Sequence, residues 1–364
     1  MPNIVSYGFT NLETLMAQRV VDVQVETVQR AVIESAMEHT RIMNEMLSQM
    51  VTRTTSHMIR YQLPAGGTLQ PLDDAGNPLP VTPTGTYDVA FPIKGAGTAW
   101  GTNRISRAMM TVEDAARFTY DAMQKDADWM RRHMLAALLD NTTYTYTDPM
   151  YGALTVQPLA NGDSVTYVRA GGAVAGDNHY LAQANAIGNS DNPFPTIYAE
   201  LDEHPSNIGP YIVYVPTNLI STITALANFR EADDAMYRFG TGVTLLNVAN
   251  NSMETRRDNP MSHFGNRLVG AVDGCVIVEW NSLPDSYMVA HASGVNDVLG
   301  MREYPQPELQ GLFPEVHDVD GNRWVNRMLR YCGFGVMNRV GALVYRVGNG
   351  SYAIPSGFTT PLPA

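Results

Sequence analysis

Few residues in this 364-residue chain have the types and spacing that catalysis or cofactor binding requires. The GAG motif at 95–97 lacks the third glycine of a dinucleotide-binding fingerprint, because Trp100 stands at that position. The DVDG motif at 318–321 resembles the start of a calcium-binding EF-hand loop. Its glycine comes too early, however, and Leu329 stands where that loop needs a glutamate. We therefore expect a glycine-permitted bend at the first motif and a hairpin turn at the second.

The other nucleophiles and metal ligands are scattered along the chain. The eight histidines form no HExxH motif and no pair at metal-ligand spacing. His179 lies near Asp177 and Asp191, which could form a site only through folding, and a hydrogen-bonded surface histidine is the default interpretation. Ser293 precedes Gly294 without the GxSxG nucleophile elbow. The sequence thus predicts no catalytic residue, no cofactor and no metal, as in a protein that is not an enzyme.

Composition sets further limits. The length suggests about two domains, and the apolar fraction of 45% is ordinary for a globular protein. The net charge of −12 argues against a nucleic-acid-binding surface that works by counterion release. Among 24 basic residues only Lys94 and Lys125 are lysines. This arginine bias fits ion pairs between packed surfaces, and codon composition explains it equally well.

Cysteine usage and hydropathy bear on the compartment. Cys275 and Cys332 lie far apart and form no CxxC motif, so neither a disulfide framework nor a zinc ribbon is expected. We expect reduced, buried thiols in a protein made in a cytoplasm. No run of 18 apolar residues occurs, and the N-terminus lacks a basic region followed by an apolar one. The sequence therefore predicts no membrane span and no secretion signal.

The elements that would position any site are organised around residues 111–141, which predict one long helix. Thr111 is a good N-cap, and Asp114 has the spacing of a capping box. The predicted buried stripe recurs every three or four residues and comprises Val112, Ala116, Thr119, Met123, Ala127, Met130, Met134 and Leu138. The predicted outer face carries the i,i+4 pairs Glu113–Arg117, Asp121–Lys125 and Asp128–Arg132. At about 1.5 Å per residue the helix would be roughly 45 Å long, which is more typical of a structural spine than of a site.

A helical arm and a long excursion precede this helix. Residues 11–52 have a mostly helical pattern, and the methionines on its apolar side indicate either core packing or an arm that lies on a neighbouring subunit. Six prolines exclude a helix from residues 61–107, and DDAGNP at 73–78 has the composition of a turn. Residues 87–91 alternate like a strand. We interpret this region as a two-stranded ribbon, and because a lone ribbon is marginally stable in water, it indicates assembly.

The rest of the chain predicts a mixed α/β or α+β domain. Candidate strands are residues 154–157, 165–168, 211–215, 268–270, 275–280 and 287–290. Candidate helices are residues 196–203 and the segment after Pro216 that contains Leu219, Ile223 and Leu226. Residues 325–347 alternate like one or two long strands.

This order of arm, ribbon, spine helix, α/β domain and returning strands resembles the Hong Kong 97-type major capsid protein of tailed bacteriophages. Stretches similar to capsid proteins of long-tailed phages, including the large thermophilic siphophages, are LQPLDDAGNPLP (69–80), FPIKGAGTAWGTNRISR (91–107), the helix 111–141 and DNHYLAQANAI (177–187). The resemblance is most specific over residues 60–200, and it rests on element order from residue 206 onward. It implies an α+β Hong Kong 97-like capsid fold without catalytic residues.

The resemblance implies six segments. They are an N-terminal arm (1–60), an extended E loop (61–110), a P domain with the spine helix (111–205), an A domain (206–290), return strands of the P domain (291–340) and a C-terminal A-domain tail (341–364).

Partners follow from the same resemblance. The chain would be a homo-oligomer of hexamers and pentamers in a virion assembled in the host cytoplasm, with a portal and optionally a decoration protein. Only about sixty residues precede the ribbon, which favours a separate scaffolding protein over the scaffolding region of the founding member. Packaged double-stranded DNA would be near the shell without sequence-specific contact, and no membrane is involved. Some relatives crosslink a loop lysine to a neighbour's asparagine, but Lys94 lies at the base of this loop, so non-covalent packing is expected.

Assembly would be mechanical. Each copy would bury its arm, ribbon and domain edges against several neighbours, and heterologous contacts would close into rings. Maturation would be a concerted rotation of rigid domains, and an acidic inner surface would hold DNA without gripping it. The residues predicted to contact neighbouring subunits are Asp73, Asp74, Asn77, Met43, Met46, Met50, Arg302 and Glu303.

Three alternatives remain. An encapsulin-type shell of a bacterial nanocompartment has the same fold with an enzyme cargo, and bound cargo peptide would favour it. A soluble α/β enzyme without a recognisable motif would be a monomer with a deep pocket and a perturbed carboxylate. A tail-tube or decoration protein would be mostly β and shorter, which the long predicted helix argues against.

Overall fold

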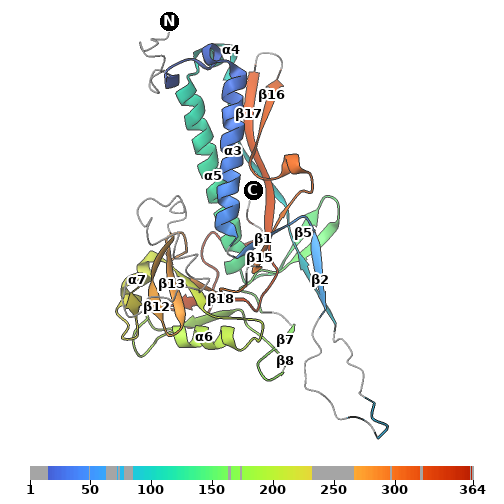
Figure 1. Ribbon diagram of the computed structural model, residues 1–364, viewed down its shortest axis with the longest axis vertical. Helices are drawn as coiled ribbons and strands as arrows, with labels where there is room; N and C mark the ends of the chain where they lie inside the picture. Colours follow the sequence, from blue (N-terminus) through green and yellow to red (C-terminus); the bar gives the residue numbers. More distant parts are fainter. Residues whose placement is uncertain are drawn as a thin grey trace.

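Two large β-sheets and a pair of long helices are the main elements of the described part of the chain, which is elongated (Figure 1). The helices and a five-stranded sheet form the long axis, and a seven-stranded sheet lies beside its base. The computed structural model describes residues 15–48, 50–62, 72, 74–77, 85–162, 165–172, 174–231, 266–295, 297–319, 323–360 and 362.

The predicted spine helix is α5 (Val112–Leu139). Its N-terminus has the expected capping box, in which the Asp114 amide donates to Thr111 Oγ1 over 3.1 Å and the Thr111 amide donates to the Asp114 carboxylate over 3.2 Å. A second long helix, α3 (Val25–Leu47), packs beside it and confirms the helical pattern predicted within residues 11–52. Two short helices, α2 (Val20–Val23) and α4 (Arg104–Met109), lie at the far end of this pair (Figure 1).

The two faces of α5 differ from the predicted pattern in detail. The predicted buried positions Thr119, Met130, Met134 and Leu138 are confirmed. Elsewhere the buried residues are Ala115, Ala122 and Asp126, each one position before the predicted Ala116, Met123 and Ala127. The ion pairs on its outer face are Asp121–Lys125 at 2.6 Å, Asp114–Arg117 at 3.3 Å and Asp128–Arg131 at 2.5 Å. Only the first is one of the predicted i,i+4 pairs. Arg117 pairs with Asp114 instead of Glu113, and Arg132 donates to the carbonyl of Gly357 instead of pairing with Asp128.

The capping box makes a local prediction. Replacing Thr111 with alanine removes the oxygen that accepts the Asp114 amide, and it should lower the free energy of unfolding by about 1 kcal/mol. Urea denaturation of the purified full chain measures this loss. As a control, Thr145→Ala changes an exposed strand residue and should cost less than about 0.5 kcal/mol. Equal losses for the two variants would contradict the capping role.

A seven-stranded mixed sheet forms one end of the chain, in the order β11-β12-β13-β10-β14-β18-β9. Its strands are β9 (Tyr180–Gln183), β10 (Tyr211–Val215), β11 (Arg230–Glu231), β12 (Asn266–Val272), β13 (Cys275–Trp280), β14 (Tyr287–Ala292) and β18 (Ala342–Val347). Every residue of β10 and β14 is buried, as expected for central strands with continuous apolar sequence. Helices α6 (Phe194–Asp202) and α7 (Thr217–Thr224) pack on this sheet.

A five-stranded sheet packs against the long helices. Its strands are β1 (Val51–Thr54), β4 (Lys94–Asn103), β15 (Leu299–Glu303), β16 (Phe313–Val319) and β17 (Arg323–Val336). The long strand β17 is its centre and pairs antiparallel with β4, β15 and β16. The β16–β17 pairing is that of the hairpin predicted at the DVDG motif, although residues 320–322 lie outside the described part of the chain.

Three two-stranded units lie outside these sheets. The ribbon consists of β2 (Met58–Gln62) and β3 (Thr86–Ala90), paired antiparallel. The hairpins β5 (Tyr144–Asp148) to β6 (Gly152–Val156) and β7 (Thr166–Val168) to β8 (Val174–Gly176) follow α5 in the chain. A single 3₁₀ turn, η3 (Pro307–Leu309), connects β15 to β16.

The excursion predicted for residues 61–110 is shorter than expected, because residues 94–103 form strand β4 beside β17. The GAG motif at 95–97 is therefore extended rather than bent. A Cβ atom at Gly95 would lie 2.5 Å from the Tyr331 ring, and one at Gly97 would lie 2.5 Å from Leu329. Side chains of the neighbouring strand occupy the space that a side chain on β4 would need.

The boundary predicted at residue 206 is too late in the chain. Strand β9 joins the seven-stranded sheet in parallel with β18, and α6 packs on the same sheet. The pairing partner of β9 lies more than 160 residues further along the chain. No local pattern near residue 180 could indicate it.

Candidate inter-subunit surfaces

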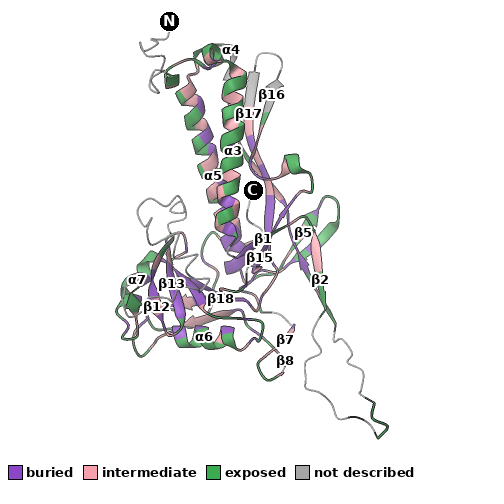
Figure 2. Cartoon of the chain, viewed as in Figure 1, coloured by how far each residue is buried: buried purple, intermediate pink, exposed green. Residues whose placement is uncertain are grey.

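The β2–β3 ribbon leaves the body of the subunit (Figures 1 and 2). Its base is anchored, because Val89, Ala90 and Phe91 are buried and the Phe91 amide donates to the His57 carbonyl over 2.9 Å. Its outer half is exposed, and the Arg60–Asp88 ion pair there is 2.6 Å long. Among the described strands, β2 and β3 pair only with each other. An isolated ribbon of this kind is marginally stable in water, so contact with another molecule would stabilise it.

The turn predicted at the tip of the excursion is present where the structure describes it. Residues 74–76 form a turn or bend, and Gly76 has a φ of +81°, which favours glycine. Asp74 and Asn77 are exposed, and Asp73 lies outside the described residues. Contact between these three residues and a neighbouring subunit stays a prediction.

The predicted methionine contacts have a different outcome. Met43 and Met50 lie in the main hydrophobic cluster, and Met46 is half-buried against it. Core packing, one of the two interpretations of this helix face, is therefore observed for Met43 and Met50. The accessible methionine of α3 is Met37, which is 67% exposed and which the sequence pattern did not single out.

Arg302 and Glu303 also lie inside the subunit rather than on its surface. Arg302 Nη1 donates to Asp148 Oδ2 over 2.7 Å and to the Phe91 carbonyl over 2.9 Å. Glu303 accepts from the Gly311 amide over 3.0 Å and forms an ion pair with Arg53. Arg302 and Glu303 are therefore too deeply buried in the subunit for the predicted direct contact with a neighbour. Arg302 links strand β15 to the base of the ribbon, and Glu303 links the same strand to Arg53 on β1 and to Gly311.

The Asp148–Arg302 pair makes stability depend on pH. Burial opposes ionisation of Asp148, but the Met150 amide and the Arg302 guanidinium outweigh it and hold the pKa of this carboxyl below its usual value. A depressed pKa contributes stability above the unfolded-state value, about 4, and this contribution is lost as the pH falls through the lower folded value. Asp148→Asn should therefore cost about 2 kcal/mol at pH 7 and progressively less below pH 4.

Unfolding transitions of wild type and Asp148→Asn between pH 2.5 and pH 7 measure this dependence. Asp121→Asn is the control, because Asp121 pairs with Lys125 on the exposed face of α5. Its effect should stay below about 1 kcal/mol at every pH. A constant difference between wild type and Asp148→Asn across the range would contradict the assignment.

Sequence reasoning missed a buried ionic network that joins five elements. Asp126 on α5 accepts from Arg330 Nε over 2.5 Å, from Arg330 Nη2 over 2.9 Å, and faces His39 Nε2 at 2.9 Å. Arg330 is 1% exposed and lies 3.8 Å from Glu303, which in turn pairs with Arg53. The network connects α3, α5 and the five-stranded sheet. A charged residue on the apolar face of a predicted helix is the only signal in the sequence.

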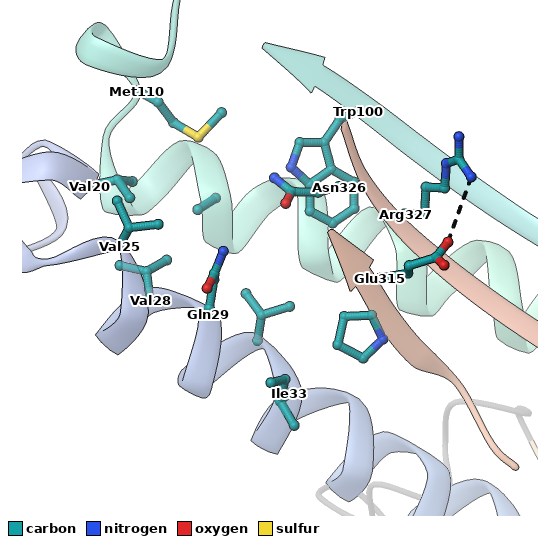
Figure 3. A pocket seen from close by; sticks show the side chains of 13 residues that line it. Val20, Val25, Val28, Gln29, Ile33, Trp100, Met110, Glu315, Asn326 and Arg327 are labelled. Carbon is teal, nitrogen blue, oxygen red and sulfur yellow. Dashed lines mark ion pairs between the residues drawn. The ribbon is translucent and has the colours of Figure 1, made fainter. Parts of the chain in front are cut away.

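An apolar hollow of about 120 Å³ lies at the far end of the long helices (Figure 3). Val20, Val25 and Val28 line one side of it, Trp100 and Met110 another, and the Glu315–Arg327 ion pair of 3.6 Å lies at its edge. The surrounding surface carries large exposed apolar side chains on α2, α3 and α4, namely Val21, Ile33, Ile105 and Met109. This distal apolar surface is a second candidate for contact between subunits.

The described residues give little support for covalent chemistry. Burial raises the pKa of the thiols of Cys275 and Cys332 to about 12, which leaves them protonated and unreactive at neutral pH. Both are free cysteines. In the described part of the chain, no helix combines the length and apolar character that crossing a membrane requires.

Comparison with known proteins finds similar solved structures, but no protein-family model and no curated protein sequence matches the chain. A solved structure from Mycobacterium phage Patience is similar over 99% of both chains, with 16% identity and a TM-score of 0.63. Two weaker similarities are the mature capsid of bacteriophage PhiM1 (11% identity, 82% of this chain and 85% of that chain, TM-score 0.46) and the holo-SrpI encapsulin complex of Synechococcus elongatus (13%, 84% and 87%, TM-score 0.42).

The phage Patience structure bears on the architecture, because it matches nearly the whole chain with a TM-score above 0.5. The α+β class is observed directly in the two sheets and the long helices. The resemblance read from the sequence is thus confirmed at the level of structure: the chain has the Hong Kong 97-like fold.

Proposed function

We propose that this chain is the major capsid protein of a tailed bacteriophage and assembles as hexamers and pentamers into an icosahedral shell around double-stranded DNA. The observation that carries the proposal is the β2–β3 ribbon, which leaves the body and has no other strand partner among the described residues. A neighbouring copy would supply the missing contacts. The full-length similarity to the phage Patience structure supports the same conclusion.

The proposed function is structural: it depends on contacts between subunits and not on catalysis. The ribbon and the distal apolar surface lie at opposite ends of an elongated subunit, so that one copy can contact several neighbours. Many weak contacts made together give a stable assembly without any strong single bond. Because the two ends differ, the contacts are heterologous, and such contacts close into rings. We propose that maturation rotates the two sheet units as rigid bodies and re-lays the arm and ribbon.

The partners of the shell are part of the proposal. A separate scaffolding protein, a portal and optionally a decoration protein would complete the virion. The net charge of −12 supports an inner surface that holds packaged DNA by proximity without binding its phosphates. A dense basic inner surface on the assembled shell would contradict this point.

We propose that the shell is held together without a lysine crosslink. Lys94 Nζ donates to the carbonyl of Leu362 within the same chain, and burial lowers the pKa of this amine. A lysine held against its own C-terminal tail at the base of the loop is poorly placed to reach a neighbour. Denaturing electrophoresis of assembled particles should therefore give a band at the monomer mass of 40.0 kDa.

Electron microscopy and nucleic acid analysis of particles from the native source test the proposal. We expect icosahedral shells that contain DNA. Shells with a bound protein cargo and no DNA would instead favour an encapsulin-type compartment. A monomer on size-exclusion chromatography, with no particles in any preparation, would favour a soluble enzyme and contradict both shell functions.

A further inference from the structure

A cluster of buried ionisable side chains lies where the β7–β8 hairpin meets the end of α6 (Figure 1). His204 Nε2 is 2.9 Å from Asp177 Oδ2 and 3.6 Å from Glu203 Oε1. His179 Nδ1 is 3.7 Å from the same Asp177 oxygen. One ligand atom from each of Asp177, Glu203 and His204 lies within 4.8 Å of the others. The assembly surfaces described above do not include this cluster.

Hydrogen bonding around His204 leaves two ways to satisfy the cluster, a second proton on the imidazole ring or a bound cation. His204 Nδ1 lies 3.2 Å from the Val168 carbonyl oxygen, which can only accept, so Nδ1 must carry the proton. In the neutral ring Nε2 then has a lone pair, and this lone pair faces the carboxylates of Asp177 and Glu203. Three acceptors directed at one point require either an additional proton on His204 or a metal ion between them.

Burial and charge favour the metal ion. Asp177 is 7% exposed and His204 is 2% exposed. Asp177 Oδ1 and Glu203 Oε1 are buried and accept no hydrogen bond from the described residues. Arg169 is the cation that pairs with both carboxylates, at 2.9 Å from Glu203 Oε2 and 3.7 Å from Asp177 Oδ1.

We propose that Asp177, Glu203 and His204 form a binding site for one divalent transition-metal cation of the Zn²⁺ type. Imidazole nitrogen with two carboxylate oxygens is a donor set that suits Zn²⁺ and disfavours Mg²⁺. Ligands about 2.0–2.2 Å from a tetrahedral ion lie about 3.3–3.6 Å apart, so the 3.6 Å separation fits and the 2.9 Å separation opens by about half an ångström.

The surroundings resemble the supporting shell of known metal sites. A metal-binding histidine usually donates its other ring N–H to a backbone carbonyl, as His204 does to Val168. Arg169 holds the second oxygen of Glu203 and so orients the first one toward the cluster. The Ala170 amide also donates to the Glu203 carbonyl over 2.6 Å. A bound ion would therefore fasten the β7–β8 hairpin to the end of α6 and to the seven-stranded sheet.

Isothermal titration of the metal-free full chain with ZnCl₂ tests the site, with MgCl₂ as the hard-cation comparison. We expect one Zn²⁺ per subunit, at least tenfold weaker binding of Mg²⁺, and a higher unfolding temperature with Zn²⁺ than with a chelator. Asp177→Asn and His204→Gln should each weaken Zn²⁺ binding at least tenfold. Asp191→Asn is the matched control, because its carboxylate bonds Asn185 and Ser190 outside the cluster.

Wild-type protein that binds no Zn²⁺, or variants that bind it as tightly as wild type, would overturn the proposal. In the first case His204 carries a second proton and forms an ion pair with Asp177. Should His204→Gln fail to fold, Asp177→Asn keeps the shape of the side chain and gives the same test. The result is independent of whether the chain forms shells, since the titration is done on subunits.

Discussion

Replacing Asp126 with alanine is expected to lower the free energy of unfolding by about 3–5 kcal/mol. The Arg330 guanidinium would remain buried at 1% exposure after losing its two hydrogen bonds to the carboxylate. Burial opposes ionisation of Asp126, but the hydrogen bond with His39 and the charge of Arg330 outweigh it and keep its pKa low. Asp126 is therefore ionised at neutral pH, and its negative charge balances the buried Arg330 guanidinium. Urea denaturation of the unassembled subunit measures the effect.

The same helix provides a matched control. Asp128 lies two residues away, is 64% exposed at its side chain and pairs with Arg131. Asp128→Ala should therefore cost less than about 1 kcal/mol. A double variant, Asp126→Leu with Arg330→Met, removes both charges together and should be more stable than Asp126→Ala. A loss below about 1 kcal/mol for Asp126→Ala would show that Arg330 finds another partner or water.

Shortening the excursion is expected to abolish shells while leaving the subunit folded. The variant replaces residues 63–85 with a two-residue Asn-Gly turn between β2 and β3, which suits a tight hairpin. The buried anchors Val89, Ala90 and Phe91 are retained, so the core should be intact. Contacts that act together by avidity are lost together, so particle yield should fall at least 100-fold. Sedimentation and electron microscopy measure the particles.

Circular dichroism and the unfolding midpoint show whether the shortened variant is folded, and both should match wild type. Arg60→Ala with Asp88→Ala is the milder companion variant, because it removes only the exposed ion pair of the ribbon. It should reduce particle yield less than the deletion does. Wild-type yields of shells from the shortened variant would contradict a role of residues 63–85 in assembly.

Local signals in the sequence were sufficient for elements whose stability is local. Thr111 and Asp114 define the start of α5 by their own hydrogen bonds, and the prediction of that cap is confirmed. Strands β10 and β13 are continuous apolar runs, and both are found where predicted. Strand β4 was not predicted, because the glycines at 95 and 97 were interpreted as a bend. These positions are glycine because side chains of the neighbouring strand β17 lie too close to leave room for a Cβ atom.

The candidate sites depend on contacts between distant residues, which the sequence alone does not reveal. Asp126 and Arg330 are separated by 204 positions, and Arg302 and Asp148 by 154. Arg302 and Glu303 were predicted to contact neighbouring subunits, yet each has a buried partner of opposite charge within its own chain. His204 was not singled out, although nearby Asp177 and His179 were. His204 follows the end of α6, and the fold of the chain there brings it next to Asp177.

A cryo-electron microscopy reconstruction of the assembled protein tests the central claim most directly. The account predicts rings of six and five subunits in which each β2–β3 ribbon lies on an adjacent subunit. A ribbon folded onto its own subunit within such rings, or preparations that contain only monomers, would contradict it.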